Sequence, residues 1–350
     1  MVDCEKSSNF ARMNLQMFRY ITLSVVLTAA LMLLSACSDS DDAPATAAPA
    51  ETAPQEVLFN ANVRSMLDGT RANTIDSNTL LQGQDLKIDA YFHGTNTAYL
   101  DSKHLKYDTD HWRFDNGSGT ELHYYWPIEG SVYNPSSANI TVSSLDFVGS
   151  CPFTTPGYVT PTYSHSTGLS FTCNMSSYMT NTDQASMPEY LVAVLNGQTL
   201  ATQTAAGGAL PLVFKHPFAL VKFVITEGSG THVQVNSVSI PALYTGATCT
   251  YNGSTMSWSS PSGSTAMTQT GVNLKYGTPT TQTDPFIVIP NNYGTKTLTV
   301  NCTWDDWSAV TKDLSADVSF DWEPGYIYTY NLTITKYALT VDTSKYTEQW

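Results

Sequence analysis

Residues 56–63 of the chain read EVLFNANV. Val57, Phe59, Ala61 and Val63 occupy every second position in it. Side chains two residues apart lie on the same face of a β-strand, so the stretch is predicted to be a strand with one apolar face. In a β-sandwich such a face fills a slot in the core between two sheets.

The same alternation of apolar residues recurs along the rest of the chain. It is found at residues 86–92, 233–240, 298–304 and 326–334. Turn dipeptides separate the runs, at Asn116-Gly117, Pro156-Gly157, Asn196-Gly197, Asn252-Gly253 and Pro324-Gly325. Beyond residue 55 no segment shows a sustained apolar period of 3.6 residues, which a helix would require. Many short strands at this spacing predict an all-β protein built from β-sandwiches.

The composition supports a folded protein and argues against nucleic-acid binding. Charged residues make up 13% of the 350-residue chain and aromatic residues 11%. A disordered chain has the opposite balance, with many charges and few aromatics. The formal net charge is −14, and so acidic a protein repels a phosphate backbone.

Residues 1–36 are predicted to be a secretory signal peptide. Residues 21–34 are uncharged and mainly apolar, and Arg19 precedes them. This run is shorter than the about 20 residues that a membrane-spanning helix needs. Leu34-Ser35-Ala36-Cys37 resembles a bacterial lipobox, which implies cleavage before Cys37 and a lipid on its thiol. The alternative is an ordinary signal peptide. Translation can start at Met1, Met13 or Met17.

The mature chain is predicted to contain a tether and two domains. Residues 37–55 begin with an acidic run and continue with Ala, Pro and Thr, a composition that cannot form a core. Residues 199–209 (TLATQTAAGGA) are small and polar and are interpreted as a linker. These segments divide the chain into a tether at 37–55, an N-terminal β-sandwich at 56–205 and a C-terminal β-sandwich at 206–350.

Four cysteines remain for the two sandwiches once Cys4 and Cys37 are set aside. Cys151 and Cys173 fall in the first domain, and Cys249 and Cys302 in the second. Two disulfides within domains, Cys151–Cys173 and Cys249–Cys302, are one interpretation. The other is four buried free thiols, which are common in protein cores. The sequence leaves both open.

No motif for catalysis, metal binding or a cofactor stands out. The sequence has no G-x-S-x-G, no P-loop, no H-E-x-x-H and no C-x-x-C. His104 and His111 flank two aspartates, an arrangement that we interpret as a polar turn and not as a metal site. His216 lies in an apolar stretch and is predicted to be a hydrogen-bonded core histidine. We therefore expect no enzyme activity, no cofactor and no metal.

Several segments, taken in order, resemble the fimbrillin family, the subunits of type V pili in anaerobic Gram-negative bacteria. The matching segments are Thr70-Arg71-Ala72, residues 84–91, Tyr125-Trp126-Pro127, residues 212–223 with His216, residues 286–290, residues 322–328 and the final Trp350. Pro217 departs from the pattern, because the family often has Ala there. The resemblance covers residues 37–350.

The resemblance implies a fold and a mode of assembly. The fold is two tandem transthyretin-like β-sandwich domains. The lipoprotein precursor is exported to the outer membrane, an arginine-specific protease removes the first strand, and a strand from another pilus subunit fills the vacated groove. The cut falls after Arg71 or after Arg64. Residues 337–350 are the candidate donor strand. The alternative function is a monomeric cell-surface lipoprotein that binds glycans.

Overall fold

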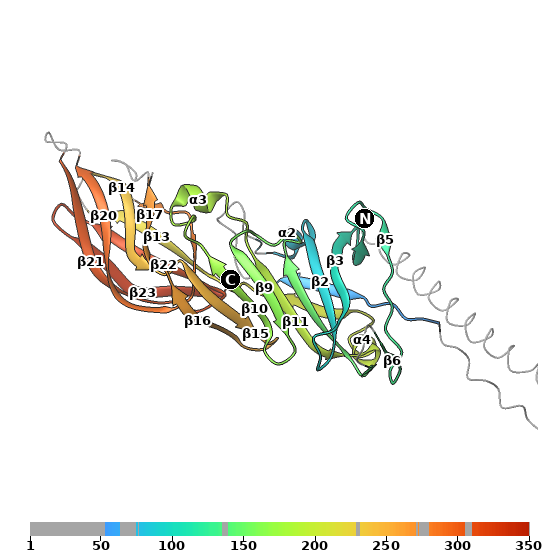
Figure 1. Cartoon of the computed structure of the whole chain (residues 1–350). Helices are drawn as coiled ribbons and strands as arrows, with labels where there is room; N and C mark the ends of the chain where they lie inside the picture. Colours follow the sequence, from blue (N-terminus) through green and yellow to red (C-terminus); the bar gives the residue numbers. More distant parts are fainter. Residues whose placement is uncertain are drawn as a thin grey trace, which may run out of the picture. The chain divides into compact units, whose positions relative to one another are not determined.

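The computed structural model describes residues 53–63, 75, 77–134, 139–228, 232–270, 272, 280–304 and 310–349, with the backbone alone for 343–349. Residues 54–350 belong to one compact unit. Apart from three short helices, its regular structure consists of β-strands (Figure 1), which confirms the all-β prediction. No helix in these ranges has the length and apolar character that crossing a membrane requires.

The N-terminal sandwich packs a six-stranded sheet against a two-stranded one. The large sheet has the order β11 (Leu191–Gln198), β8 (Leu145–Cys151), β2 (Asp85–Phe92), β3 (Ala98–Asp108), β4 (His111–Asp115) and β5 (Glu121–Leu122). The small sheet consists of β1 (Phe59–Val63) and β12 (Leu210–Phe214), and a separate hairpin of β6 (Val132–Tyr133) and β7 (Ile140–Thr141) lies beside them. The apolar residues between the two sheets form what we call the N-terminal core.

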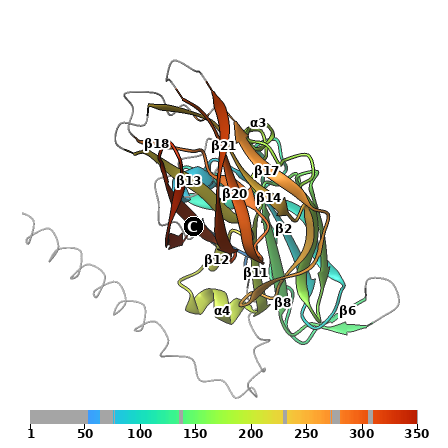
Figure 2. The same ribbon diagram turned by 90° about the vertical axis from the view of Figure 1, so that its left-hand side faces the viewer.

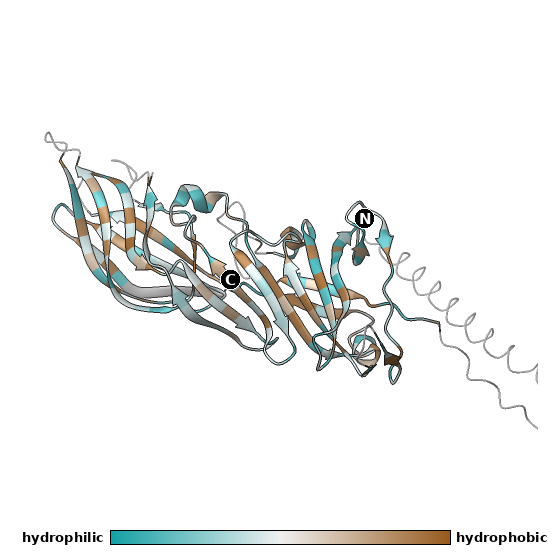
Figure 3. Cartoon of the chain, in the orientation of Figure 1, coloured by the Kyte–Doolittle hydropathy of each residue, from teal (hydrophilic) through white to brown (hydrophobic). Residues whose placement is uncertain are grey.

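The C-terminal sandwich has a five-stranded sheet facing a four-stranded one. One has the order β18 (Thr280–Gln282), β13 (Ala219–Glu227), β22 (Tyr326–Ile334) and β23 (Leu339–Gln349), with β19 (Phe286–Val288) also paired to β13. The other, whose strands are labelled in Figure 2, has the order β17 (Thr265–Thr270), β14 (Val233–Leu243), β20 (Asn292–Trp304) and β21 (Thr311–Asp321). Hydrophilic and hydrophobic residues alternate along these strands (Figure 3), and the apolar face fills the C-terminal core.

A further sheet joins strands from both predicted domains, which the sequence did not indicate. Its order is β16 (Met256–Ser262), β15 (Gly246–Tyr251), β10 (Gly168–Asn174) and β9 (Val159–Ser164). It packs on β8 and β11, whose side chains point alternately to the two faces of their sheet. One set faces the N-terminal core. The other set, including Val148 and Val192, packs with Phe171 and Cys249 of the further sheet in what we call the middle core. This explains why every residue of β8 is buried.

The predicted linker at 199–209 contains a helix and leads back into the N-terminal core. The helix is α4 (Leu200–Ala205), and it starts with a capping box in which Thr199 and Thr202 each bond the other's backbone N–H. The chain then enters β12, whose Leu210, Leu212 and Phe214 lie in the N-terminal core. Contacts therefore cross residue 205 at β12 and at β15, and the domain boundary there stays a prediction.

All four cysteines of the sandwiches are buried free thiols. Of the two interpretations left open by the sequence, the structure has the buried thiols and not the disulfides, because the two cysteines of each suggested pair lie in different cores. Cys151 belongs to the N-terminal core, Cys173 and Cys249 to the middle core, and Cys302 to the C-terminal core. Burial raises the pKa of the Cys173 thiol to about 11 and that of Cys302 to about 12, so both stay protonated at neutral pH.

Candidate functional site: the first strand and its groove

The first strand lies in a groove of the N-terminal sandwich, as its alternation predicts. β1 runs parallel to β12, with Phe59 opposite Leu210 and Val63 opposite Phe214. Val57, Phe59, Ala61 and Val63 are all at most 4% exposed. The ring of Phe59 meets Phe147 edge to face at 5.1 Å between centroids. The predicted apolar face is therefore confirmed, and its four side chains are part of the N-terminal core.

The backbone of β1 is held on one edge by a single ladder. In the described part of the chain, β12 is its one ladder partner, and parallel pairing is slightly less stable per residue than antiparallel pairing. The other edge has an isolated bridge between Glu56 and Tyr125. There the Val57 N–H donates to the Tyr124 carbonyl at 2.8 Å. The strand is thus deeply packed by its side chains and sparsely paired by its backbone.

A buried side-chain amide extends the β12 ladder at the start of the strand. Gln203, on α4, is 5% exposed. Its Oε1 accepts from the Leu58 N–H at 2.9 Å, and its Nε2 donates to the Glu56 carbonyl at 2.8 Å. The same Oε1 accepts from Trp126 Nε1 at 3.0 Å. Sequence reasoning missed this role, because Gln203 stands in the predicted linker. The Thr199–Thr202 capping box was the available signal for a helix.

The far end of the strand is bound by a residue beyond the arginine segment. The Val63 N–H donates to Asn78 Oδ1 at 2.9 Å. Asn78 begins α2 (Asn78–Gln82), which Ser77 caps. Arg64 and Arg71, the two candidate cleavage positions, lie between Val63 and this helix and fall outside the described residues. Cys37, the candidate lipidation residue, also falls outside them.

A buried carboxylate fixes the chain directly after the arginine segment. Glu189 Oε2 accepts from the Ile75 N–H at 2.5 Å, and Glu189 Oε1 lies 2.6 Å from Nδ1 of His216. The side chains of His216 and Glu189 are 1% and 2% exposed. His216 is therefore the hydrogen-bonded core histidine that the sequence predicted. Burial raises the pKa of the nearby Cys151 thiol, and the negative charge of Glu189 adds to that shift.

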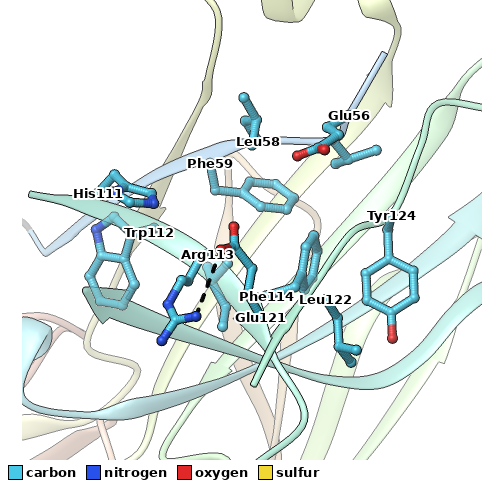
Figure 4. A pocket seen from close by; sticks show the side chains of 12 residues that line it. Glu56, Leu58, Phe59, His111, Trp112, Arg113, Phe114, Glu121, Leu122 and Tyr124 are labelled. Carbon is cyan, nitrogen blue, oxygen red and sulfur yellow. Dashed lines mark ion pairs between the residues drawn. The ribbon is translucent and has the colours of Figure 1, made fainter. Parts of the chain in front are cut away.

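A pocket of about 170 Å³ opens along the edge of β1 away from β12. Figure 4 shows the Phe59 and Phe114 rings inside it and the Arg113–Glu121 ion pair at one side. The pocket lies between the first strand and β3, β4 and β5. Its walls are mostly apolar side chains with charged groups at the rim, including Glu56, which pairs with His123 at 2.9 Å. The groove around β1 is therefore not completely filled by the strand.

The candidate donor segment is itself an edge strand. Residues 339–349 form β23, which pairs antiparallel with β22. In the sheet order β23 is at the end, so one of its edges has no partner strand among the described residues. Leu339 is 8% exposed and packs in the C-terminal core, and Val341 packs against that core while partly exposed. Over residues 339–342, whose side chains are described, the burial is less complete than in β1.

Nothing in the described residues forms a metal centre. No group of three or more His, Cys, Asp or Glu side chains is placed to hold a metal ion there. His104 Nδ1 lies 2.8 Å from Asp85, and His111 Nδ1 lies 2.7 Å from Asp110. The two histidines are thus in separate local pairs, with His104 on β3 and His111 at the start of β4.

The chain resembles solved structures of bacterial adhesion proteins. A putative cell adhesion protein from Bacteroides uniformis is 19% identical with a TM-score of 0.51, over 84% of this chain and 99% of the other. One from Bacteroides ovatus is 12% identical with a TM-score of 0.51, over 85% and 98%. The tip fimbrial protein Mfa3 from Porphyromonas gingivalis is 10% identical with a TM-score of 0.42, over 85% and 99%. At these identities the likeness concerns the fold.

The family assignment comes from the sequence. No curated protein matches the chain. The model of the fimbrillin-like family matches residues 70–350, which is most of the chain and includes α2, every strand after β1 and the buried Glu189–His216 pair. The chain therefore belongs to the fimbrillin-like family.

Proposed function

We propose that this protein is a structural or adhesive subunit of a type V pilus. It is exported as a lipoprotein, anchored in the outer membrane by a lipid on Cys37, cut by an arginine-specific protease, and assembled with other pilus subunits by strand exchange at the cell surface. The observation that carries the proposal is the packing of β1: a strand with a fully buried apolar face, a single parallel ladder, and two arginines in the segment that follows it.

The groove left by β1 would be a strong acceptor for another strand. Removing β1 together with the residues before it takes away four buried apolar side chains, those of Val57, Phe59, Ala61 and Val63, and burying a large one is worth about 1.5–3 kcal/mol. It also exposes the backbone groups of β12 that pair with β1. An extended segment can refill the core with its apolar side chains and pair its backbone groups with those of β12 at the same time. The β23 segment has alternating Leu339 and Val341 and occupies a sheet edge, which suits the donor role.

Replacing both arginines tests the proposal. Arg64→Ala together with Arg71→Ala should leave the segment uncut by an arginine-specific protease, and the purified full chain should then form no polymer. Gel electrophoresis reports the cut and light scattering reports polymerisation. Arg113→Lys is the control, because lysine keeps the ion pair with Asp108 and both candidate sites remain. Polymerisation of the double variant at the wild-type rate would disprove strand exchange after cleavage.

The lipid anchor has its own test. Cys37→Ser should abolish incorporation of labelled fatty acid and release the protein from the membrane fraction of the producing cell, because serine lacks the thiol that carries the lipid. Cys4→Ser, in the leader, should change neither. Labelling of the Cys37→Ser protein at the wild-type level would rule out this anchor.

Glycan binding by a monomer has less support. Every tryptophan side chain in the described part of the chain is buried or half-buried, so none of them forms an exposed stacking platform for a sugar. Among the described aromatic side chains, only those of Tyr125, Tyr133 and Tyr337 are exposed, and the others are buried or half-buried.

A further inference from the structure

Gln203 replaces one peptide unit of a β-ladder. In the β1–β12 ladder, the Leu210 N–H donates to the Leu58 carbonyl at 2.8 Å. Moving toward the start of β1, the next two groups on that edge are the Leu58 N–H and the Glu56 carbonyl. Both are bonded by the Gln203 amide, the N–H by Oε1 and the carbonyl by Nε2. A parallel neighbour strand would offer a carbonyl and an N–H in the same places.

The Gln203 side chain is held ready for this contact by groups outside β1. Trp126 Nε1 donates to its Oε1, and the Trp126 ring packs edge to face on Phe147 at 5.8 Å between centroids. The backbone of α4 fixes the other end of the side chain, because the Gln203 carbonyl accepts from the Gly208 N–H at 2.9 Å. If β1 left the groove, the Gln203 Nε2 would lose the Glu56 carbonyl, while the bond between the Gln203 carbonyl and the Gly208 N–H does not involve the leaving segment.

These contacts recognise the main chain and not a side chain. A buried amide that loses its partners is costly, so the empty groove favours an occupant with a carbonyl at one position and an N–H two residues later. We propose that Gln203 is a positioning residue that binds the backbone of any strand in the β1 groove at one fixed point, through a carbonyl and the N–H two residues later. This inference rests on the proposed strand exchange, and it adds the rule by which a donor is aligned.

Gln203 fixes the point in the groove from which the register is counted, and the apolar side chains select the register that we assign to residues 336–343 of a second copy of this chain. With the Lys336 carbonyl and the Ala338 N–H on Gln203, Tyr337, Leu339 and Val341 fall in the places of Val57, Phe59 and Ala61. A shift by one residue would turn Thr340 and Asp342 inward, and a shift by two in one direction would bury Lys345 in the place of Val63. An occupant also cannot have proline at the position aligned with Leu58, since proline lacks the N–H.

Peptides with single N-methyl groups test the inference on the cleaved full-length protein. One peptide covers residues 54–63 and the other residues 335–345. N-methylation of Leu58 in the first, or Ala338 in the second, removes the N–H that Gln203 reads and should weaken binding about tenfold. The controls are N-methyl Phe59 and N-methyl Leu339, whose N–H groups point to the opposite edge. Fluorescence anisotropy gives the dissociation constants.

The same peptides are then measured on two variants. With Gln203→Met the unmodified peptides should bind about tenfold more weakly, and the extra effect of N-methyl Leu58 or Ala338 should fall to less than about twofold. Gln198→Met is the matched control, because that side chain contacts the Asn196 carbonyl and not the groove. If Gln203→Met does not fold, the N-methyl series on the unchanged protein still decides the question.

The outcomes separate the inference from the proposed function. Binding of both peptides with no difference between the two N-methyl positions would overturn the role of Gln203 and leave strand exchange standing. A Gln203 effect with the first peptide alone would overturn the assigned donor register. Failure of both peptides to bind the cleaved protein would reject strand exchange itself, and with it this inference.

Discussion

Glu189→Ala is expected to lower the free energy of unfolding by about 3–5 kcal/mol. The Glu189 carboxylate is 2% exposed and bonds both the Ile75 N–H and His216. Its removal leaves an imidazole and a backbone N–H in an apolar environment without the oxygens that they contact. Urea unfolding followed by fluorescence measures the loss. Hydrogen exchange at the Ile75 amide should become faster in the variant, because its acceptor is gone.

Two controls show whether the effect comes from the buried pair. Glu129→Ala, at an exposed glutamate, should change the free energy of unfolding by less than about 0.5 kcal/mol. The double variant Glu189→Leu with His216→Phe should regain much of the stability, because replacing both members of a buried pair by apolar residues is often neutral. A loss under about 1 kcal/mol in Glu189→Ala would mean that the pair does not hold the segment after the arginines.

Phe59→Ala is expected to destabilise the N-terminal sandwich by about 3–5 kcal/mol, the usual cost of truncating a buried phenylalanine. The ring is 3% exposed and meets both Phe147 and Phe114 edge to face. Since Phe59 is also the largest side chain on the buried face of β1, the truncated strand should leave the groove faster after cleavage. Urea unfolding measures the first effect, and gel filtration of the cut protein measures the second.

Leu58→Ala provides the matched control on the same strand. Leu58 is 39% exposed and points away from the core, so its truncation should cost less than about 1 kcal/mol and leave the release of the cut strand nearly unchanged. Equal effects of the two substitutions would show that the apolar face does not determine how firmly β1 is held.

The local features of the fold could be read from the sequence because they depend on neighbouring residues. The alternation at Val57, Phe59, Ala61 and Val63 correctly predicted which face of β1 is buried. The same reasoning gave the all-β class, and His216 was placed in the core because apolar residues surround it in the sequence. For the strands, a spacing of two residues was enough, since it fixes the side of the sheet.

The remaining features depend on pairs that are distant along the chain. The pairing of β10 with β15, which creates the middle core, joins Phe171 to Cys249, and no local pattern indicates such a partner. The same pairing places Cys173 and Cys249 in the middle core, apart from Cys151 and Cys302, with which they would form the disulfides within each predicted domain. Gln203 and Glu189 were missed for a similar reason, because a polar residue shows its buried role only when its distant partners are known.

The course of the chain through β12 bears on how a fibre would carry load. β12 lies beside the groove occupant, and its chain continues past His216 directly into β13, which pairs with β22 over residues 220–227 in a parallel ladder. β22 in turn pairs with β23, the candidate donor. A force that pulls on the strand in the groove would thus pass along the main chain from β12 to β13. From there it would reach the donor strand through the hydrogen bonds of the β13–β22 and β22–β23 pairs, and it would act along the strands. Pulled this way, many hydrogen bonds resist together, and neither sandwich needs to open for the fibre to hold.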